Sequence, residues 1–345
     1  MACTKKKFLA LIIVTITIGC SPIYTRDVKP PTFLSNKDLG VAVLSPDHQT
    51  IVFDLRSKYK SQLYKVRVNG TGLVSLGDGS TRDIDPVFSP DGSTVLFSHI
   101  LKGQGDLCVM KIDGSDRKCL TSGPEHDFDP VYSPDGNEIY FLRAQVFTNY
   151  SPIAAPAWHE IDIFSINANG SGLKRITFKS NYGMSSLSIN PLGDTLMVLG
   201  PGDRVNLHQI YIIPTDNPTN WSVVQPDLTK YRPKKIMLGP QKIDYSQLRN
   251  PRFSPDGTHI LFSWPYHDGL YLMNLQTNQT KKIWESKKED FGRRYPRFSR
   301  DGRQVVFSTV KKCDQPNFWG LQLGKEPEIW IVNTDGTDLH AVEIK

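Results

Sequence analysis

Three kinds of segment are missing from this sequence of 345 residues. The apolar stretch at residues 8–18 is too short to cross a bilayer, and no other segment is long and apolar enough, so no transmembrane helix is predicted. No run of basic residues interleaved with aromatic residues occurs, which argues against nucleic acid as a partner. No G-x-S-x-G or H-E-x-x-H motif occurs either, and no catalytic pair follows from spacing, so no catalytic residues and no metal ligands are assigned.

Cysteine is also scarce, with five in the chain. Cys3 and Cys20 lie in the N-terminal segment, which leaves Cys108, Cys119 and Cys313 for the folded part. Three is an odd number, and the spacing matches no zinc or redox motif. Cys108 and Cys119 could meet across adjacent strands, but the expected hairpin register does not place them opposite each other. Buried thiols that act as small hydrophobic side chains are therefore predicted.

The N-terminus has the pattern of a targeting segment. Lys5, Lys6 and Lys7 precede the apolar stretch, which ends before Gly19-Cys20. Small residues before a cysteine resemble the lipobox of bacterial lipoproteins, which implies a signal peptide over residues 1–19 and a lipidated Cys20. Ser21 in place of Asp resembles the sorting pattern for the outer membrane, facing the periplasm. Residues 20–38 are predicted to be a tether, and an ordinary cleaved signal peptide is the alternative.

The rest of the chain is dominated by a repeat. Six segments follow the pattern F-S-P-D-G-x-x-I-x-F more or less closely, and they begin at Val43, Val87, Val131, Ser188, Arg252 and Arg297. Proline presets φ at the second position of a turn, Asp can bond its own backbone, and Gly accepts the left-handed conformation. Short β-branched runs flank each turn, so each copy is predicted to be a β-hairpin.

A second hairpin follows each copy and carries an Asn-Gly or Asp-Gly turn, as at Asn69-Gly70 and Asp113-Gly114. Each unit is then four antiparallel strands in about 40–45 residues, which is the length of one propeller blade. The sequence therefore predicts an all-β fold, a six-bladed β-propeller of four-stranded antiparallel blades over residues 39–345. A β-sandwich is the alternative, but it does not explain a repeated four-strand cassette.

The cassette, with its N-x-D-G-x-G turn and a following R-L-T strand, resembles the repeat of TolB-type propellers. The resemblance covers residues 39–345 and implies the fold rather than a function, because oligogalacturonate lyases and the tricorn protease and prolyl oligopeptidase groups have similar repeats. The α/β domain that precedes the TolB propeller has no counterpart here. The absence of G-x-S-x-G argues against a peptidase of the prolyl oligopeptidase type.

The larger insertions all fall on one predicted face of the propeller, opposite the short S-P-D-G turns. They are residues 143–159, 229–248 and 311–327. Functional insertions in repeat folds gather on one face, so the binding surface is predicted there. Its candidate residues are Trp158, His159, Tyr231, Arg232, Phe318 and Trp319. Tolerated surface loops are the alternative.

The central channel is predicted from the innermost strand of each unit. Its acidic candidates, in two adjacent blades, are Asp83, Asp85, Asp127 and Asp129, and its further candidates are Asn250, Tyr295, Arg249, Arg293 and Arg294. Four carboxylates could hold a divalent cation, or they could bind a basic group of a partner opposite the arginines. Asp side chains that cap backbone groups at strand starts are the alternative. No other cofactor is predicted.

Together these features predict a non-catalytic lipoprotein of the cell envelope. Its channel mouth and loop face are expected to bind an envelope protein or a cell-wall or glycan component, and the propeller is expected to be a monomer on a lipid anchor. The alternative is a carbohydrate-active lyase or hydrolase of the oligogalacturonate lyase type. That family would gather metal ligands on the loop face, where four histidines could lie: His99, His126, His159 and His267.

Overall fold

Short strands separated by tight turns make up the whole of the described structure. The computed structural model describes residues 38–57, 60–77, 79–148, 157–202, 208–231, 248–264, 269–285, 290–291, 295–313 and 324–345. All of them belong to one unit, residues 34–345. The signal peptide, Cys20 and the tether up to residue 37 lie outside the described residues. In the described part, no helix has the length and hydrophobicity that a bilayer crossing requires.

The strands fall into consecutive groups, each starting at an inner strand. Group 1 is β1 (Asp38–Leu44), β2 (Thr50–Arg56), β3 (Ser61–Arg67) and β4 (Val74–Ser75). Group 2 is β5 (Arg82–Phe88), β6 (Thr94–Leu101), β7 (Gln104–Lys111) and β8 (Lys118–Cys119). Group 3 is β9 (His126–Tyr132), β10 (Glu138–Thr148), β11 (Ala157–Asn167) and β12 (Lys174–Arg175).

The second half of the chain repeats this order. Group 4 is β13 (Ser185–Ile189), β14 (Thr195–Pro201), β15 (His208–Pro214) and β16 (Ser222–Val224), followed by the short 3-10 helix η1 (Thr229–Tyr231). Group 5 is β17 (Arg249–Phe253), β18 (His259–Trp264), β19 (Gly269–Asn274) and β20 (Thr280–Glu285). Group 6 is β21 (Asp290–Phe291), β22 (Arg297–Phe298), β23 (Gln304–Cys313), β24 (Gly324–Asn333) and β25 (His340–Ala341).

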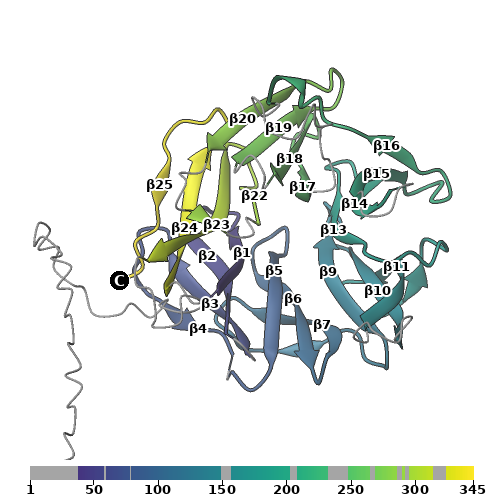
Figure 1. Cartoon of the computed structure of the whole chain (residues 1–345). Helices are drawn as coiled ribbons and strands as arrows, with labels where there is room; N and C mark the ends of the chain where they lie inside the picture. The colour runs from purple at the N-terminus through teal and green to yellow at the C-terminus, as the bar shows by residue number, and fades with distance from the viewer. Residues whose placement is uncertain are drawn as a thin grey trace, which may run out of the picture. The chain divides into compact units, whose positions relative to one another are not determined.

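The groups are arranged in a ring with their first strands innermost (Figure 1). The all-β propeller prediction is confirmed. Among the described residues, hydrogen bonding gives five sheets rather than six, because one parallel bridge between Ser61 and Arg82 joins groups 1 and 2 into a single eight-stranded sheet. Groups 3, 4 and 5 are separate four-stranded sheets, and group 6 is five-stranded.

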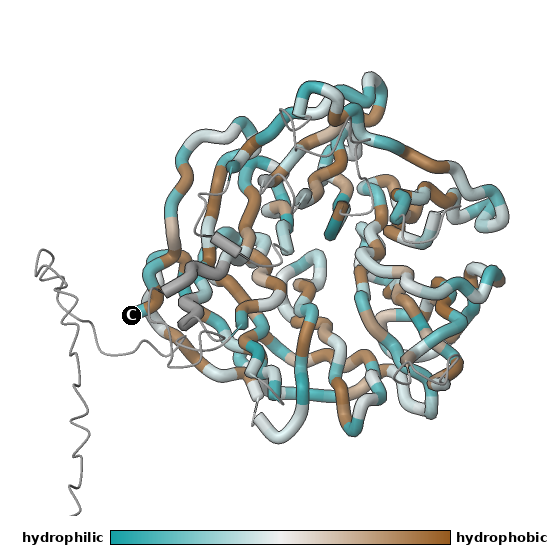
Figure 2. The backbone as a smooth tube through the Cα atoms, in the orientation of Figure 1, coloured by the Kyte–Doolittle hydropathy of each residue, from teal (hydrophilic) through white to brown (hydrophobic). Residues whose placement is uncertain are grey.

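Apolar residues form short runs along the strands, which are the brown stretches of the tube in Figure 2, and their side chains pack between neighbouring groups. One cluster contains Val52 and Leu63 of group 1 with Phe97 and Met110 of group 2. Similar clusters join groups 2 and 3, 3 and 4, 4 and 5, and 5 and 6. Each sheet thus buries its faces against its neighbours, which a lone four-stranded sheet cannot do.

The ring closes between group 6 and group 1. Phe53 and Leu55 of group 1 pack in one cluster with Ile329 and Ile331 of group 6. The Ser308 hydroxyl donates to the Gly40 carbonyl at 2.9 Å, and the last residue, Lys345, donates its amide to Gly70 at 2.9 Å. Within the described strands, every group comes from one continuous segment, so side-chain packing rather than an exchanged strand closes the ring.

Each S-P-D-G turn joins the first two strands of its group, as predicted. In Ser89-Pro90-Asp91-Gly92, the Asp91 carboxylate accepts the Ser89 hydroxyl at 2.6 Å and the Ser93 amide at 3.0 Å. Gly92 has a φ of 75° and lies against Pro46 of the preceding group, where a Cβ would come within 3.1 Å of the proline ring. The same glycine–proline contact recurs at four further joints of the ring.

The prediction of unpaired thiols at Cys108 and Cys119 is wrong, because the two form a disulfide. Asp116 has a φ of 53° and adds one residue to the turn between β7 and β8. The equivalent left-handed positions of the sister hairpins are Gly72 and Gly172. This additional residue shifts the pairing by one and sets Cys119 directly opposite Cys108.

Candidate functional site

A β-bulge interrupts the innermost strand just before the aligned proline. Pairing shifts between Ile84 and Val87 and at the corresponding places in groups 1, 3, 4 and 5. Four residues at this position have left-handed φ values between 53° and 64°: Asp85, Asp129, Ser186 and Asn250. Short polar side chains tolerate this conformation, and after Asp85, Asp129 and Asn250 the following proline has no amide that the ladder could use. Bulges of this kind re-aim a side chain.

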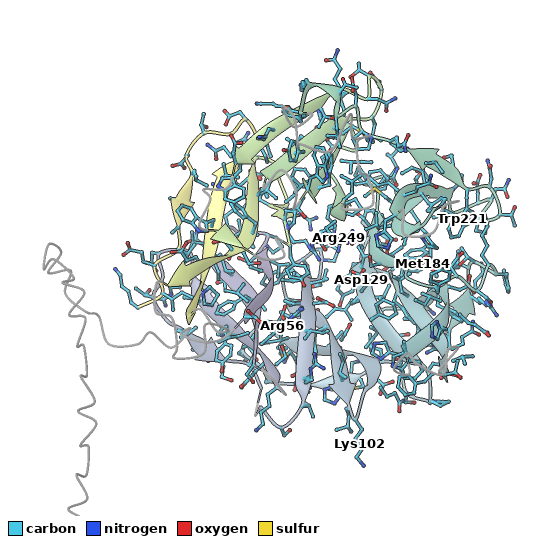
Figure 3. The ribbon with its side chains drawn as sticks, viewed as in Figure 1. Arg56, Lys102, Asp129, Met184, Trp221 and Arg249 are labelled. Carbon is cyan, nitrogen blue, oxygen red and sulfur yellow. A yellow bond between two sulfur atoms is a disulfide. The ribbon has the colours of Figure 1, made fainter. Side chains whose placement is uncertain are left out.

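Asp129 lies toward the middle of the ring, as do Arg56 and Arg249, whereas Lys102 and Trp221 lie at its periphery (Figure 3). The Asp129 carboxylate accepts the backbone amides of Ser186 and of Leu187, the latter at 3.2 Å. It also forms an ion pair with Arg252 at 3.3 Å. These contacts join groups 3, 4 and 5 across the inside of the ring.

Asp85 belongs to a second set of contacts, centred on Arg56 at the end of β2. Arg56 pairs with the buried Asp54 and, at 3.3 Å, with Asp85, and it donates to the Tyr295 hydroxyl at 3.3 Å. Burial raises the pKa of Asp85 to about 6, although Arg56 acts in the opposite direction. Burial disfavours the charge of Arg56 as well, but Asp54 and Asp85 raise its pKa above the usual value.

Two arginines follow the bulge position by two residues in groups 5 and 6. Arg252 and Arg297 stand where Val43, Val87 and Val131 stand in groups 1 to 3. Burial, and then the charge of Arg252, lowers the pKa of Arg297 to about 9, so the side chain stays protonated at neutral pH. Arg297 donates a hydrogen bond to the Pro296 carbonyl at 3.0 Å. No carboxylate of the described residues pairs with it.

These side chains line a cavity of about 490 Å³. Its inner part contains Asp85, Asp129, Arg252 and Arg297, and its mouth is formed by residues of the S-P-D-G turns, namely Pro46, Pro90, Pro134, Pro191, Pro255 and Arg300. We call it the turn-face cavity. It opens on the face of the short repeated turns, whereas the predicted binding surface was the opposite face.

Two departures from the repeat fall at the joint between groups 6 and 1. His48 replaces the turn glycine in group 1 and Arg300 replaces the turn proline in group 6. Glycine–proline contacts occur at the five other joints of the ring, and the joint between groups 6 and 1 has no such contact. There, His48 Nε2 lies 3.6 Å from Asp301, and Arg300 reaches across the mouth to the Pro90 carbonyl of group 2.

The four predicted channel carboxylates do not form one cluster. Asp83 accepts both Nη1 and Nη2 of Arg117, at 2.8 and 2.9 Å, and lies 2.8 Å from His99 Nδ1. Asp127 accepts Nε and Nη2 of Arg143 at 2.6 and 2.8 Å. The bulge separates these buried pairs from Asp85 and Asp129, so the four carboxylates that could together hold a divalent cation do not come together.

The other predicted site residues are dispersed. Trp158 stacks on His126 with ring centroids 5.1 Å apart and donates its Nε1 to the Gly103 carbonyl at 3.0 Å. Half-buried His159 is its neighbour on β11. Tyr231 packs edge-on against Tyr271 and binds the β20 backbone with its hydroxyl. Arg249 lies 3.1 Å from His208. Five candidates lie outside the described residues: Arg232, Arg293, Arg294, Phe318 and Trp319.

The histidines of the alternative lyase hypothesis also fall into separate surroundings. His99 belongs to the Asp83 pair, whereas His126 is half-buried and stacks on Trp158, and desolvation lowers the pKa of His126. His267 lies outside the described residues. Across the described ranges, no three His, Cys, Asp or Glu side chains are grouped as a metal site requires.

Comparison with known proteins agrees with the ring of four-stranded groups. Residues 44–213 match the family of the TolB beta propeller domain. TolB from Acinetobacter baumannii has a TM-score of 0.58 at 15% identity, over 86% of this chain and 61% of that one. A putative TolB from Agrobacterium tumefaciens has a TM-score of 0.56 at 16% identity, over 80% and 86%. The chain therefore spans about three fifths of the Acinetobacter protein.

Oligogalacturonate lyase from Vibrio parahaemolyticus is a third similar structure. Its TM-score is 0.52 at 13% identity, and the match covers 91% of this chain and 80% of that one. At such identities the likeness shows a shared fold and carries no information on activity.

Proposed function

We propose that this chain, which belongs to the TolB-type β-propeller family, is an exported binding module whose turn-face cavity holds a segment of a partner protein. We count its strand groups as six blades, since each group comes from one continuous segment and has a hydrophobic cluster on either side. The partner is proposed to be a protein of the cell envelope.

The observation that carries this proposal is the composition of the turn-face cavity. Apolar and aromatic side chains line its walls, among them Phe88, Tyr132, Phe253 and Phe298, and a few charged groups lie at its inner end. Binding sites commonly combine a largely apolar wall with a small number of placed polar groups. Repeat folds such as this one also present concave surfaces to their partners.

Export is supported by two features. The N-terminal pattern is that of a lipoprotein signal, so we propose that Cys20 is acylated and tethers the propeller to a membrane. The disulfide between Cys108 and Cys119 is a bond that forms and persists in oxidising compartments such as the bacterial periplasm. The proposed location is the periplasmic side of the outer membrane.

Site-specific photocrosslinking in the host cell envelope tests the proposal. We would place a photoreactive phenylalanine analogue at Phe298 in the cavity and, as a matched control, at Phe178, which is 71% exposed elsewhere on the molecule. A discrete protein adduct at position 298 that is missing at position 178 is the expected result. Adducts of equal yield at both positions, or turnover of polygalacturonate by the purified chain, would overturn it.

A further inference from the structure

We propose that the turn-face cavity contains an anion subsite, formed by Arg297 and Arg300, that takes a carboxylate of an acidic peptide segment. The inference rests on the proposed function for the peptide nature of the ligand. The anion subsite itself rests on the contacts of the two arginines.

Charge pairing inside the cavity is uneven. Arg252 pairs with Asp129 at 3.3 Å, and Asp85 pairs with Arg56 at 3.3 Å. Arg297 lines the same cavity, and among the described residues it donates to the neutral Pro296 carbonyl and pairs with no carboxylate. Burying a cation without a carboxylate or phosphate partner costs free energy. A ligand that supplies the missing anion would recover this cost.

Arg300 adds a second cation at the rim. It lies three residues after Arg297 on the segment that leads from β22 into the turn, and it also lines the cavity. At this position the other turns have a proline that packs on a glycine of the next group. Because Arg300 and His48 replace both members of that pair, Arg300 makes no proline–glycine contact, and it extends over the mouth to donate to the Pro90 carbonyl.

The cavity lining carries three arginines and two carboxylates: Arg252, Arg297 and Arg300 against Asp85 and Asp129. The net charge of these lining residues is therefore one positive charge. The guanidinium of Arg297, which pairs with no carboxylate of the described residues, lies at the inner end of the cavity. A planar guanidinium matches a carboxylate in a bidentate geometry. The apolar walls fit the side chains and backbone of a peptide better than a bare inorganic anion.

Arginine side-chain NMR on the full-length chain tests the subsite. The protein would be labelled with 15N-arginine and titrated with acetyl-Gly-Glu-Gly-amide, its Gln analogue, and inorganic phosphate. We expect the Arg297 Nε resonance to shift in a saturable way with the Glu peptide and to change little with the Gln peptide. Phosphate binding as tight as that of the Glu peptide would overturn the carboxylate assignment, and the absence of any saturable shift would overturn the subsite.

Three variants locate the effect. Arg297→Gln should weaken Glu-peptide affinity at least tenfold, Arg300→Gln should weaken it about threefold, and Arg303→Gln, whose side chain is 86% exposed, should leave it unchanged. A retained Arg143 Nε resonance and an undiminished Tm would show that each variant is folded. Unchanged affinity in both Arg297→Gln and Arg300→Gln would overturn the inference.

The same variants separate this inference from the proposed function. A crosslinked adduct at position 298 that survives Arg297→Gln, together with absent carboxylate binding, would contradict the subsite and leave the binding module intact. Saturable binding of the Glu peptide without any crosslinked adduct in the envelope would contradict the binding module and leave the anion subsite intact.

Discussion

Two pairs of aspartates lie in the same two strands, β5 and β9, and have opposite surroundings. Within each strand, the two aspartates are only two residues apart. Asp83 and Asp127, at the strand starts, are buried and held by arginines in two-point contacts. Asp85 and Asp129, at the bulges, line the cavity and pair with one arginine nitrogen each, both at 3.3 Å. The first pair stabilises the blades, and the second belongs to the cavity.

A single conformational feature produces the difference. In a regular strand, residues two apart point to the same face. A left-handed residue at the bulge, with a φ of 55° at Asp85 and 53° at Asp129, removes this relation. Chemically identical side chains in identical repeats can therefore serve structure at one position and binding at the next.

The strongest test of the comparison is Arg143→Ala. Asp127 is almost fully buried, and its side chain would be left as an uncompensated charge beneath Phe141 and Phe164, which now flank Arg143 at 5.5 and 5.2 Å. We expect the free energy of unfolding to fall by about 3–5 kcal/mol, measured by urea denaturation. A loss below about 1 kcal/mol would show that the strand-start pair is not structural.

A double variant supplies the control for this experiment. Arg143→Met with Asp127→Leu replaces both charges by apolar groups of similar size, and such replacements of buried pairs are often neutral. We expect the double variant to recover most of the loss. Recovery would attribute the effect to the unpaired carboxylate rather than to lost packing volume.

Substitution of the cavity aspartate Asp85 should raise the free energy of unfolding rather than lower it, and the size of this effect should depend on pH. The folded pKa of Asp85 is about 6, against about 3.9 in an unfolded chain. Between these values the folded state holds a proton that the unfolded state has released, so this contribution to stability falls as pH rises from about 4 to 6. Asp85→Asn, which cannot ionise, should match wild type near pH 4 and exceed it by about 1–3 kcal/mol at pH 7.

Urea denaturation of both proteins across pH 4–7 checks this expectation, with Asp127→Asn as the comparator. Because the Asp127 carboxylate accepts two hydrogen bonds from Arg143, its Asn variant should be less stable than wild type at pH 7. Equal signs for the two Asn variants at pH 7 would remove the distinction between the two pairs.

The repeat made most of the fold predictable. Proline, Asp and Gly at fixed places specify the turns, and the flanking β-branched runs specify the strands, so the all-β propeller follows from the sequence. The register of the hairpin between β7 and β8 was harder to predict. Asp116 adopts a left-handed conformation there, whereas the two equivalent hairpins have a glycine at this position. That one residue decides whether Cys108 meets Cys119.

The candidate site was predictable only in part. Asp85 and Asp129 were found from their place before the aligned proline, but the period-two pattern grouped them wrongly with Asp83 and Asp127. Arg252 and Arg297 were missed although they begin the fifth and sixth copies, where three earlier copies begin with valine. A charge at an apolar position of a repeat was the available signal. Arg56 was also missed, because it is the last residue of β2 and the repeated motif does not extend to that position.

The smallest expected effect concerns the two cavity arginines. Arg297→Met removes a half-buried cation that has no carboxylate partner among the described residues, so we expect stability to rise by about 1 kcal/mol. Arg252→Met leaves Asp129 with only its backbone amides, so we expect a loss of about 1 kcal/mol. Thermal unfolding of both variants measures the contrast. A gain at Arg297 would mean that the chain keeps a charge at a cost in stability, which is expected of a group that binds a ligand rather than one that supports the fold.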